Sequence, residues 1–189
     1  MNTQTILTKD LIKDKVICRV LGVFVFTILT ALGAFVRIPI PYSPVPITLQ
    51  TFFVILAGLI LGGSLGSASQ IFYIVLGVSG LSIFTNAGFG FSYLLGPTGG
   101  YLFGFVLVAF LLGNISKKIG SNFGLLLAIM SASMAILICG ATWLMLLFKI
   151  SPNKAFFLGI LPFIPGDIIK SILAYSIYKK IKPRVKEVF

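Results

Sequence analysis

The residues of this chain that are best placed for chemistry are Asp167 and Lys170, within the stretch FIPGDIIKS at 163–171. They stand three positions apart, so on a helix their side chains lie on one face. An ionised carboxylate accepts hydrogen bonds from N–H groups of a ligand, and a lysine ammonium donates to a carbonyl or carboxylate. The pair therefore suits a small molecule that carries both donors and acceptors. The alternative is an ion pair that only ties this helix to its neighbours, although apolar packing of the same volume is often at least as stabilising.

A second group of candidates lies in the uncharged, aromatic and glycine-rich segment 80–100. This segment is too apolar for a free surface loop, and irregular backbone at membrane depth persists only where it is buried in protein or lines a cavity. Binding sites hold a small ring between aromatic faces and orient it with a few polar groups. The alternative for each residue alone is an ordinary apolar loop. We expect ligand contacts from Asn86, Phe84, Phe89 and Tyr93, and weaker ones from Gln50 and Tyr42.

The composition argues against catalysis. The chain has no histidine, which removes the commonest general base and the commonest metal ligand. Of its four acids only Asp167 lies outside the tails, so no pair of carboxylates is available for acid–base work. The glycine-rich stretch at 96–105 lacks the spacing and the Lys-Ser/Thr ending of a nucleotide-binding loop. We therefore predict that the chain is not an enzyme, holds no metal and binds no cofactor covalently.

The elements that position these residues are predicted to be membrane helices. The chain has 189 residues, of which 58% are hydrophobic and only 10% charged, whereas soluble domains are about a quarter charged. A helical span needs roughly 20 mainly apolar residues, and the glycines of GGSLGS should separate the second span from the third. We predict an all-α membrane protein with a single domain over 1–189. Its six transmembrane helices should lie at about 18–36, 47–62, 65–79, 98–114, 122–148 and 162–181.

The basic residues predict the orientation. The formal net charge of +11 is compatible with nucleic-acid binding, but the charges cluster beside the spans, as in proteins oriented against a lipid bilayer. The two tails and the connection at 117–118 carry eleven Lys and Arg, and the connections on the other side carry three. Both termini should therefore be cytoplasmic, and no nucleic-acid partner is expected. The proline-rich connection 37–50 and the aromatic segment then share the outer face, so we expect loops to cap a ligand pocket there.

Small residues recur at four-residue spacing in the first predicted span, where Thr27 pairs with Ala31 and Thr30 with Ala34. Small faces of this kind let helices approach closely in lipid. They serve either packing against the chain's own helices or docking of a partner membrane protein, and the residues alone leave both open.

Three stretches in order resemble the BioY family: GAFVRIPIPYSPVPITLQTFFVILAGLILG, LLGPTGGYLFGF and PFIPGDIIK. BioY proteins are the biotin-specific substrate-capture (S) components of energy-coupling-factor (ECF) transporters. The resemblance implies high-affinity capture of biotin on the outer face of a prokaryotic cell membrane and its delivery inward. It also implies a transmembrane coupling protein and two ATPase subunits as partners. On this basis we favour docking of the coupling protein at Ala31 and Ala34, with Thr27 and Thr30 on the same face.

The resemblance also implies roles for the site residues. Asp167 would accept hydrogen bonds from the two ureido N–H groups of biotin, and Lys170 would donate to the ureido carbonyl or to the tail carboxylate. Further hydrogen bonds and apolar walls would come from Asn86, Phe84, Phe89 and Tyr93. The stretch 88–95 is more aromatic than the resemblance predicts. The alternatives are an S component for another vitamin, a membrane-embedded enzyme and a purely structural membrane subunit.

Overall fold

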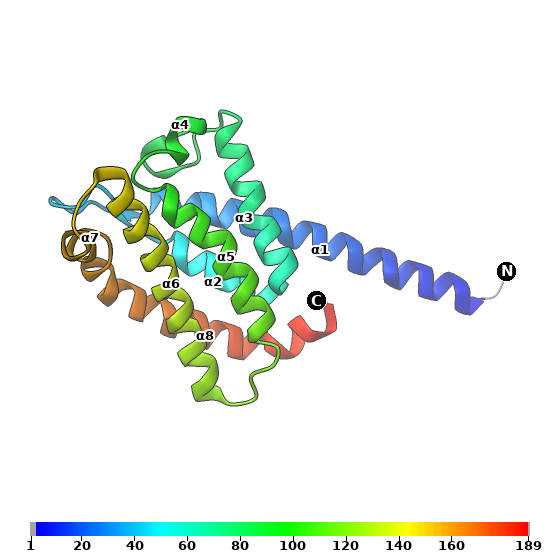
Figure 1. Ribbon diagram of the computed structural model, residues 1–189. Coiled ribbons are helices and arrows are strands. Elements are labelled where there is room, and N and C mark those ends of the chain that lie inside the picture. The colour runs from blue at the N-terminus through cyan, green and yellow to red at the C-terminus, as the bar shows by residue number, and fades with distance from the viewer. Residues whose placement is uncertain (1–2, 189) are drawn as a thin grey trace.

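The computed structural model describes the backbone of residues 3–188 and the side chains of residues 15–183. The chain is built mainly of helices that pack side by side (Figure 1), which confirms the predicted helical class. The helices of eight residues or more are α1 (Thr3–Phe35), α2 (Gln50–Leu61), α3 (Gly63–Val78), α5 (Gly99–Ile115), α6 (Asn122–Phe148), α7 (Pro152–Gly159) and α8 (Ile164–Val188).

Three stretches of the described chain are long and apolar enough to cross a membrane. They are Lys15–Phe35 in α1, all of α6, and Pro152–Pro183, which contains α7 and most of α8. The helices α2, α3 and α5 are also apolar but shorter, with 12, 16 and 17 residues. Large apolar side chains such as Phe24, Leu107 and Ile169 are exposed on the outside of the helices. An extended apolar surface of this kind suits contact with lipid.

The ends of the helices differ from the predicted ends of the spans. The helix α1 begins at Thr3, well before the predicted start at 18, and α8 continues to Val188, beyond the predicted end at 181. The added segments carry the lysines and acids that flank the apolar runs. Hydropathy therefore marks the part of a helix that can lie in lipid, while the helix itself continues into the polar flanks.

The predicted glycine break between the second and third spans is present. The helix α2 ends at Leu61 and α3 begins at Gly63, with Gly62 between them at φ 80°. A positive φ strains residues that carry a Cβ, so glycine permits the turn here. Both short helices then pack against α5.

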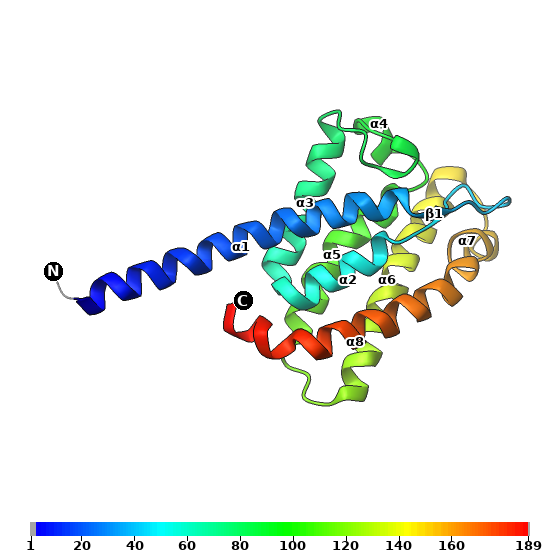
Figure 2. The ribbon, with the colours of Figure 1, turned by 180° about the vertical axis from the view of Figure 1, so that it is seen from behind.

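Two irregular segments and α7 gather at one end of the helical body, which we name the loop end (Figures 1 and 2). The proline-rich connection forms β1 (Arg37–Ile38) and β2 (Ile47–Thr48), which pair antiparallel. The aromatic segment holds a 3₁₀ turn (Thr85–Ala87) and the short helix α4 (Phe91–Leu94). The opposite end, which we name the tail end, carries the turn at Gly62, the α5–α6 connection and the C-terminal part of α8 (Figure 2).

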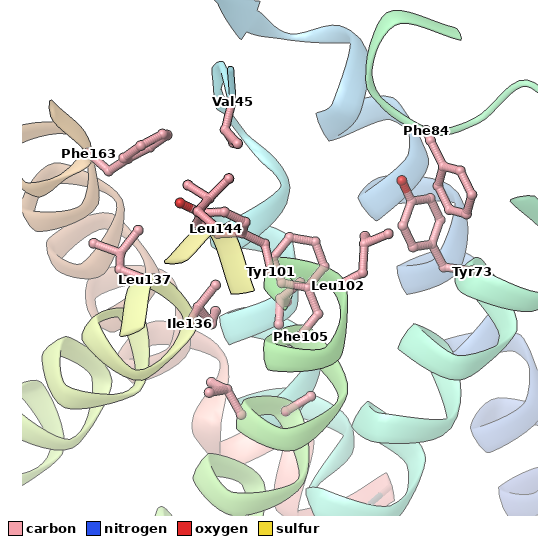
Figure 3. Packing of buried hydrophobic residues seen from close by; sticks show 13 residues of the cluster. Val45, Tyr73, Phe84, Tyr101, Leu102, Phe105, Ile136, Leu137, Leu144 and Phe163 are labelled. Carbon is pink, nitrogen blue, oxygen red and sulfur yellow. The ribbon is translucent and has the colours of Figure 1, made fainter. Parts of the chain in front are cut away.

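Two clusters of buried apolar side chains fill the body. The loop-end cluster is rich in large rings, among them Tyr73, Phe84, Tyr101 and Phe163 (Figure 3). The tail-end cluster is mainly aliphatic, and its members include Ile55, Leu59, Leu112 and Ile129. The loop-end cluster includes the predicted site residue Phe84, and Tyr93 packs against it.

Candidate ligand-binding site

The charged pair singled out in the sequence forms a buried ion pair. The helix α8 begins at Ile164 with Pro165 in its first turn, and Asp167 follows where the helix dipole favours negative charge. Lys170 lies one turn further and forms a salt bridge with Asp167 Oδ1. The Asp167 side chain is only 6% exposed and that of Lys170 only 8%. Two opposite charges are thus held inside the loop-end half of the body.

The Lys170 ammonium has a partner for each of its three hydrogens. Besides Asp167, it donates to the Thr48 carbonyl oxygen at 3.1 Å and to Thr51 Oγ1 at 2.6 Å. Thr48 belongs to β2 and Thr51 to the first turn of α2, so Lys170 joins α8 to both elements. Because an ammonium has three donors and no acceptor, a ligand that bonds to Lys170 must replace one of these partners.

The Asp167 carboxylate keeps some capacity to accept hydrogen bonds. Its Oδ1 accepts from Lys170 and from Thr51 Oγ1 at 3.5 Å, and its Oδ2 accepts from Ser133 Oγ of α6 at 2.8 Å. An ionised carboxylate offers about four acceptor positions. The partners among the described side chains use three of them, so one position on Oδ2 can take a further donor.

Asp167 and Lys170 line a hollow at the loop end, which we name the pocket. Its volume, counting the open mouth, is about 490 Å³. Among the described residues, no cluster of three or more His, Cys, Asp or Glu that could hold a metal ion is present. The apolar part of the wall includes Val45, Tyr93, Tyr101, Leu102, Phe105 and Phe163.

A second polar network holds Gln50 in the pocket wall. Its Nε2 donates to the Tyr73 hydroxyl at 2.8 Å, and its Oε1 accepts from the hydroxyls of Thr85 and Thr48, each at 3.2 Å. The Tyr73 hydroxyl in turn donates to the Ile83 carbonyl oxygen at 3.2 Å. Helices α2 and α3, strand β2 and the aromatic segment thus meet at one amide. The Gln50 amide has a second N–H that can bond to a ligand.

Tyr93 lines the pocket, and Phe84 lies behind it. The Tyr93 ring stacks on Phe84 with 4.7 Å between centroids, and Phe84 also meets the edge of the Tyr73 ring at 5.4 Å. Phe84 is fully buried and its ring packs against Gly77. Phe84 therefore supports two residues of the wall, whereas the sequence led us to expect it in the wall itself.

Asn86 and Phe89 border a separate, outer hollow. This hollow shares Thr85 and Tyr93 with the pocket, so the two spaces adjoin. Tyr42 is 66% exposed and is not among the described residues that line either space. The structure thus brings four of the predicted ligand residues to the pocket: Asp167, Lys170, Gln50 and Tyr93.

The small-residue face of α1 is packed inside the chain. Thr30 and Ala34 are fully buried, Thr27 is 2% exposed, and Ala31 packs against the loop-end cluster. The Thr27 hydroxyl donates to the Ser69 carbonyl oxygen of α3 at 2.9 Å. The geometry matches the alternative of internal packing, because α2 and α3 cover this face. Thr27, Thr30 and Ala34 thus lie inside the chain in this conformation, whereas Ala31 stays partly exposed.

Sequence reasoning missed several residues of the site. Thr51, Thr85 and Ser133 complete the polar networks, and Tyr101 lines the pocket while its hydroxyl donates to the Gly159 carbonyl oxygen at 2.8 Å. The available signal was the presence of hydroxyl groups in apolar helices. That signal is weak, because a helical serine or threonine commonly bonds to its own backbone.

Comparison with known proteins identifies the family. The BioY family model matches residues 3–187 of this chain. The chain belongs to the BioY family. A probable biotin transporter BioY of Pyrococcus horikoshii is 39% identical to this BioY family member over 160 residues, which cover 85% of this chain and 93% of that protein. A biotin transporter BioY of Thermotoga maritima is 39% identical over 158 residues, which cover 84% of this chain and 92% of that protein.

A solved structure has the same fold as this BioY family member. The crystal structure of the S-component for biotin from an ECF-type ABC transporter superposes with a TM-score of 0.83 at 29% sequence identity. The match covers 90% of this chain and 93% of that one. The resemblance noted in the sequence is thereby confirmed, and the chain is a helical membrane protein with the fold of an ECF S component.

Proposed function

We propose that this chain captures biotin in the pocket and delivers it inward as the substrate-binding subunit of an ATP-driven vitamin uptake transporter. The observation that carries the proposal is the buried Asp167–Lys170 pair in the wall of a mainly apolar pocket. Membership of the BioY family and the similarity to a biotin S-component support biotin as the ligand. The role is one of binding and transport, not of catalysis.

The groups of biotin complement the pocket. The ureido ring carries two N–H donors and one carbonyl acceptor, the bicycle packs on aromatic faces, and the tail ends in a carboxylate. Asp167 accepts a ureido N–H at its remaining Oδ2 position, and Tyr93 and Tyr101 hold the bicycle. Gln50 contributes its second amide N–H. Because these groups lie away from water, each hydrogen bond is electrostatically stronger than it would be in solution.

Lys170 donates to the ureido carbonyl or to the tail carboxylate after giving up one of its present partners. The Thr48 carbonyl is the partner most easily replaced, because its bond of 3.1 Å is longer than the 2.6 Å bond to Thr51. Ligand binding then loosens the link between α8 and β2. Asn86 and Phe89 contact the ligand from the outer hollow, on the side of the pocket mouth.

The loop end faces the outside of the cell, and both termini lie in the cytoplasm. The segments of the tail end and the two tails carry eleven Lys and Arg against three in the loop-end connections, and short basic loops stay on the cytoplasmic side. Six helices then cross the membrane: α1, α2, α3, α5, α6 and α8. The coupling protein and two ATPase subunits of an ECF transporter supply the energy.

The shortest of these helices needs the loop end to complete its crossing. With 12 residues, α2 is about 18 Å long, whereas the hydrocarbon core is about 30 Å thick. The irregular backbone before it must therefore lie at membrane depth, which is tolerated when protein covers it. The bonds of Thr48 to Lys170 and Gln50 supply such cover.

The proposal is tested by mass spectrometry of the small molecules that co-purify with the detergent-solubilised chain, followed by calorimetric titration with biotin and with other vitamins. We expect biotin to co-purify and to bind more tightly than any other vitamin. Tight binding of a different vitamin with none of biotin would overturn the choice of ligand. Turnover of a bound molecule by the purified chain alone would indicate an enzyme instead.

A further inference from the structure

Asp167 forms part of the wall between two separate spaces. One is the pocket, of about 490 Å³, and the other is an open cavity between α6 and α8 of about 430 Å³, measured in the same way. The second cavity is lined mostly by apolar side chains, including Met134 and Ile168, which are also exposed on the outer surface of the helices. We name it the lateral cavity. Ser133 lines the lateral cavity and, among the described residues, is not part of the pocket lining.

Ser133 contacts Asp167 from the side away from the pocket. It is 3% exposed, and its hydroxyl donates to Asp167 Oδ2 at 2.8 Å. Several other helical hydroxyls of this chain bond to their own helix, although that of Thr51 also donates to Asp167. Those of Thr30 and Ser176 donate to the backbone carbonyl oxygen four residues earlier, and that of Ser69 to the one three residues earlier. Ser133 instead donates its hydrogen bond to a carboxylate on another helix.

We infer that Ser133 is a positioning residue that sets the plane of the Asp167 carboxylate for ligand binding, an inference that rests on the proposed function. Lys170 and Thr51 hold Oδ1, and Ser133 holds Oδ2. A carboxylate held at both oxygens cannot rotate freely about its last side-chain torsion, which is otherwise a soft degree of freedom. The remaining acceptor position on Oδ2 therefore points in one direction, towards the pocket.

The chain offers a matched control on the same cavity. Ser171 is 1% exposed and lines the lateral cavity, and its hydroxyl has no hydrogen-bond partner among the side chains and backbone that the structure describes. Replacing Ser171 with alanine removes a buried hydroxyl of the same size from the same space without touching Asp167. A difference between the two alanine variants thus reports the hydrogen bond to the carboxylate and not the loss of an oxygen from the cavity.

The test compares Ser133→Ala, Ser133→Thr and Ser171→Ala in the full chain, with biotin affinity measured by calorimetry and stability by thermal unfolding. We expect Ser133→Ala to weaken binding about tenfold, because the Asp167 carboxylate loses the hydrogen bond that fixes its orientation. Ser133→Thr keeps the hydroxyl, its extra methyl group has room in the lateral cavity, and its affinity should stay within about twofold of the parent chain. Ser171→Ala should also stay within that range.

Three results would overturn the inference. One is a Ser133→Ala affinity equal to that of Ser171→Ala. Another is a Ser133→Thr variant as weak as Ser133→Ala. The third is a lower unfolding temperature for Ser133→Ala with unchanged affinity, which indicates a purely structural bond. If Ser133→Ala does not fold, Ser133→Cys replaces it, since a thiol is a weak donor of similar size and should weaken binding in the same way. Absence of biotin binding by the parent chain itself would contradict the proposed function and, with it, this role of Ser133, whereas the three results above contradict the role of Ser133 alone.

Discussion

The two ends of the helical body use glycine for different purposes. At the tail end, glycines bring backbones together: a Cβ on Gly58 would lie 2.8 Å from the Ala109 carbonyl oxygen, and one on Gly113 would meet the backbone of Gly62 and Gly63. At the loop end, glycines make room for aromatic rings. Gly77 lies under the ring of Phe84, and Gly140 lies under the ring of Tyr101.

This difference separates what holds the chain together from what forms the site. Close backbone contact at the tail end gives dense packing between α2, α3 and α5, as small residues do in membrane interfaces. The loop end also has close backbone contacts, as between Gly99 and Leu94, but its interior is filled by rings and by two polar networks. Changes at the loop end should therefore alter ligand binding first, and changes at the tail end should alter folding first.

The largest effect is expected at the ion pair. Asp167→Asn removes the charged acceptor and leaves Lys170 as a buried charge, so biotin affinity should fall by about 100-fold or more. Calorimetric titration of the purified variant measures the loss. The double variant Asp167→Asn/Lys170→Met removes both charges and serves as the control, since it should recover stability without recovering binding. An affinity within tenfold of the parent chain would contradict the role assigned to this carboxylate.

A glycine at the tail end should affect folding and spare binding. Gly113→Val forces α5 away from the α2–α3 turn, and overpacking of this kind typically destabilises by about 1–3 kcal/mol. Thermal unfolding in detergent should show the loss, while the folded fraction keeps its affinity for biotin. Gly120→Val is the matched control, because a Cβ at Gly120 has no neighbour within 4 Å among the described atoms. Equal unfolding temperatures for the two variants would remove the distinction between the ends.

A glycine at the loop end should affect both properties. Gly140→Ala pushes on the Tyr101 ring, which lines the pocket and bonds to Gly159. We expect biotin affinity to fall about tenfold, with a modest loss of stability. Titration and thermal unfolding of the same preparation measure the two effects together. A variant that loses stability and keeps full affinity would show that this glycine serves packing alone, as at the tail end.

The smallest effect is expected at the outer surface of the loop end. Tyr42 is 66% exposed, and neither hollow includes it among its described lining residues. Tyr42→Ala should therefore change biotin affinity by less than about twofold, as surface substitutions generally do. Titration beside Tyr93→Ala, which removes a pocket residue stacked on Phe84, gives the contrast. A loss equal to that of Tyr93→Ala would mean that Tyr42 contacts the ligand as the sequence first indicated.

Part of the site could be predicted because charge in an apolar chain is a local and conspicuous signal. Asp167 and Lys170 stood out for that reason, and their spacing correctly placed them on one helix face. Phe84 was placed in the ligand wall because it belongs to an aromatic segment. Its actual position behind Tyr93 depends on the path of the backbone around Thr85, which composition does not predict.

The small-residue face of α1 shows a second limit of prediction from the sequence. Small residues spaced four positions apart predict close approach to another helix, but they do not show whether that helix belongs to the same chain. The burial of Thr30 and Ala34 against α2 and α3 comes from the turn at Gly62, which brings these helices back along the body.

The sequence by itself determined that this is a helical membrane protein, that its chain turns within the stretch GGSLGS, and that one acid and one base share a face of its last long helix. These properties depend on hydropathy, glycine and charge, which act over one or two helical turns. Only the tertiary structure decided which atoms surround that pair. Ser133 meets Asp167 across 34 residues of chain and Thr51 meets Lys170 across 119. Contacts over such separations follow from how the helices pack, because no local pattern distinguishes a serine that bonds to its own helix from one that holds a carboxylate on another.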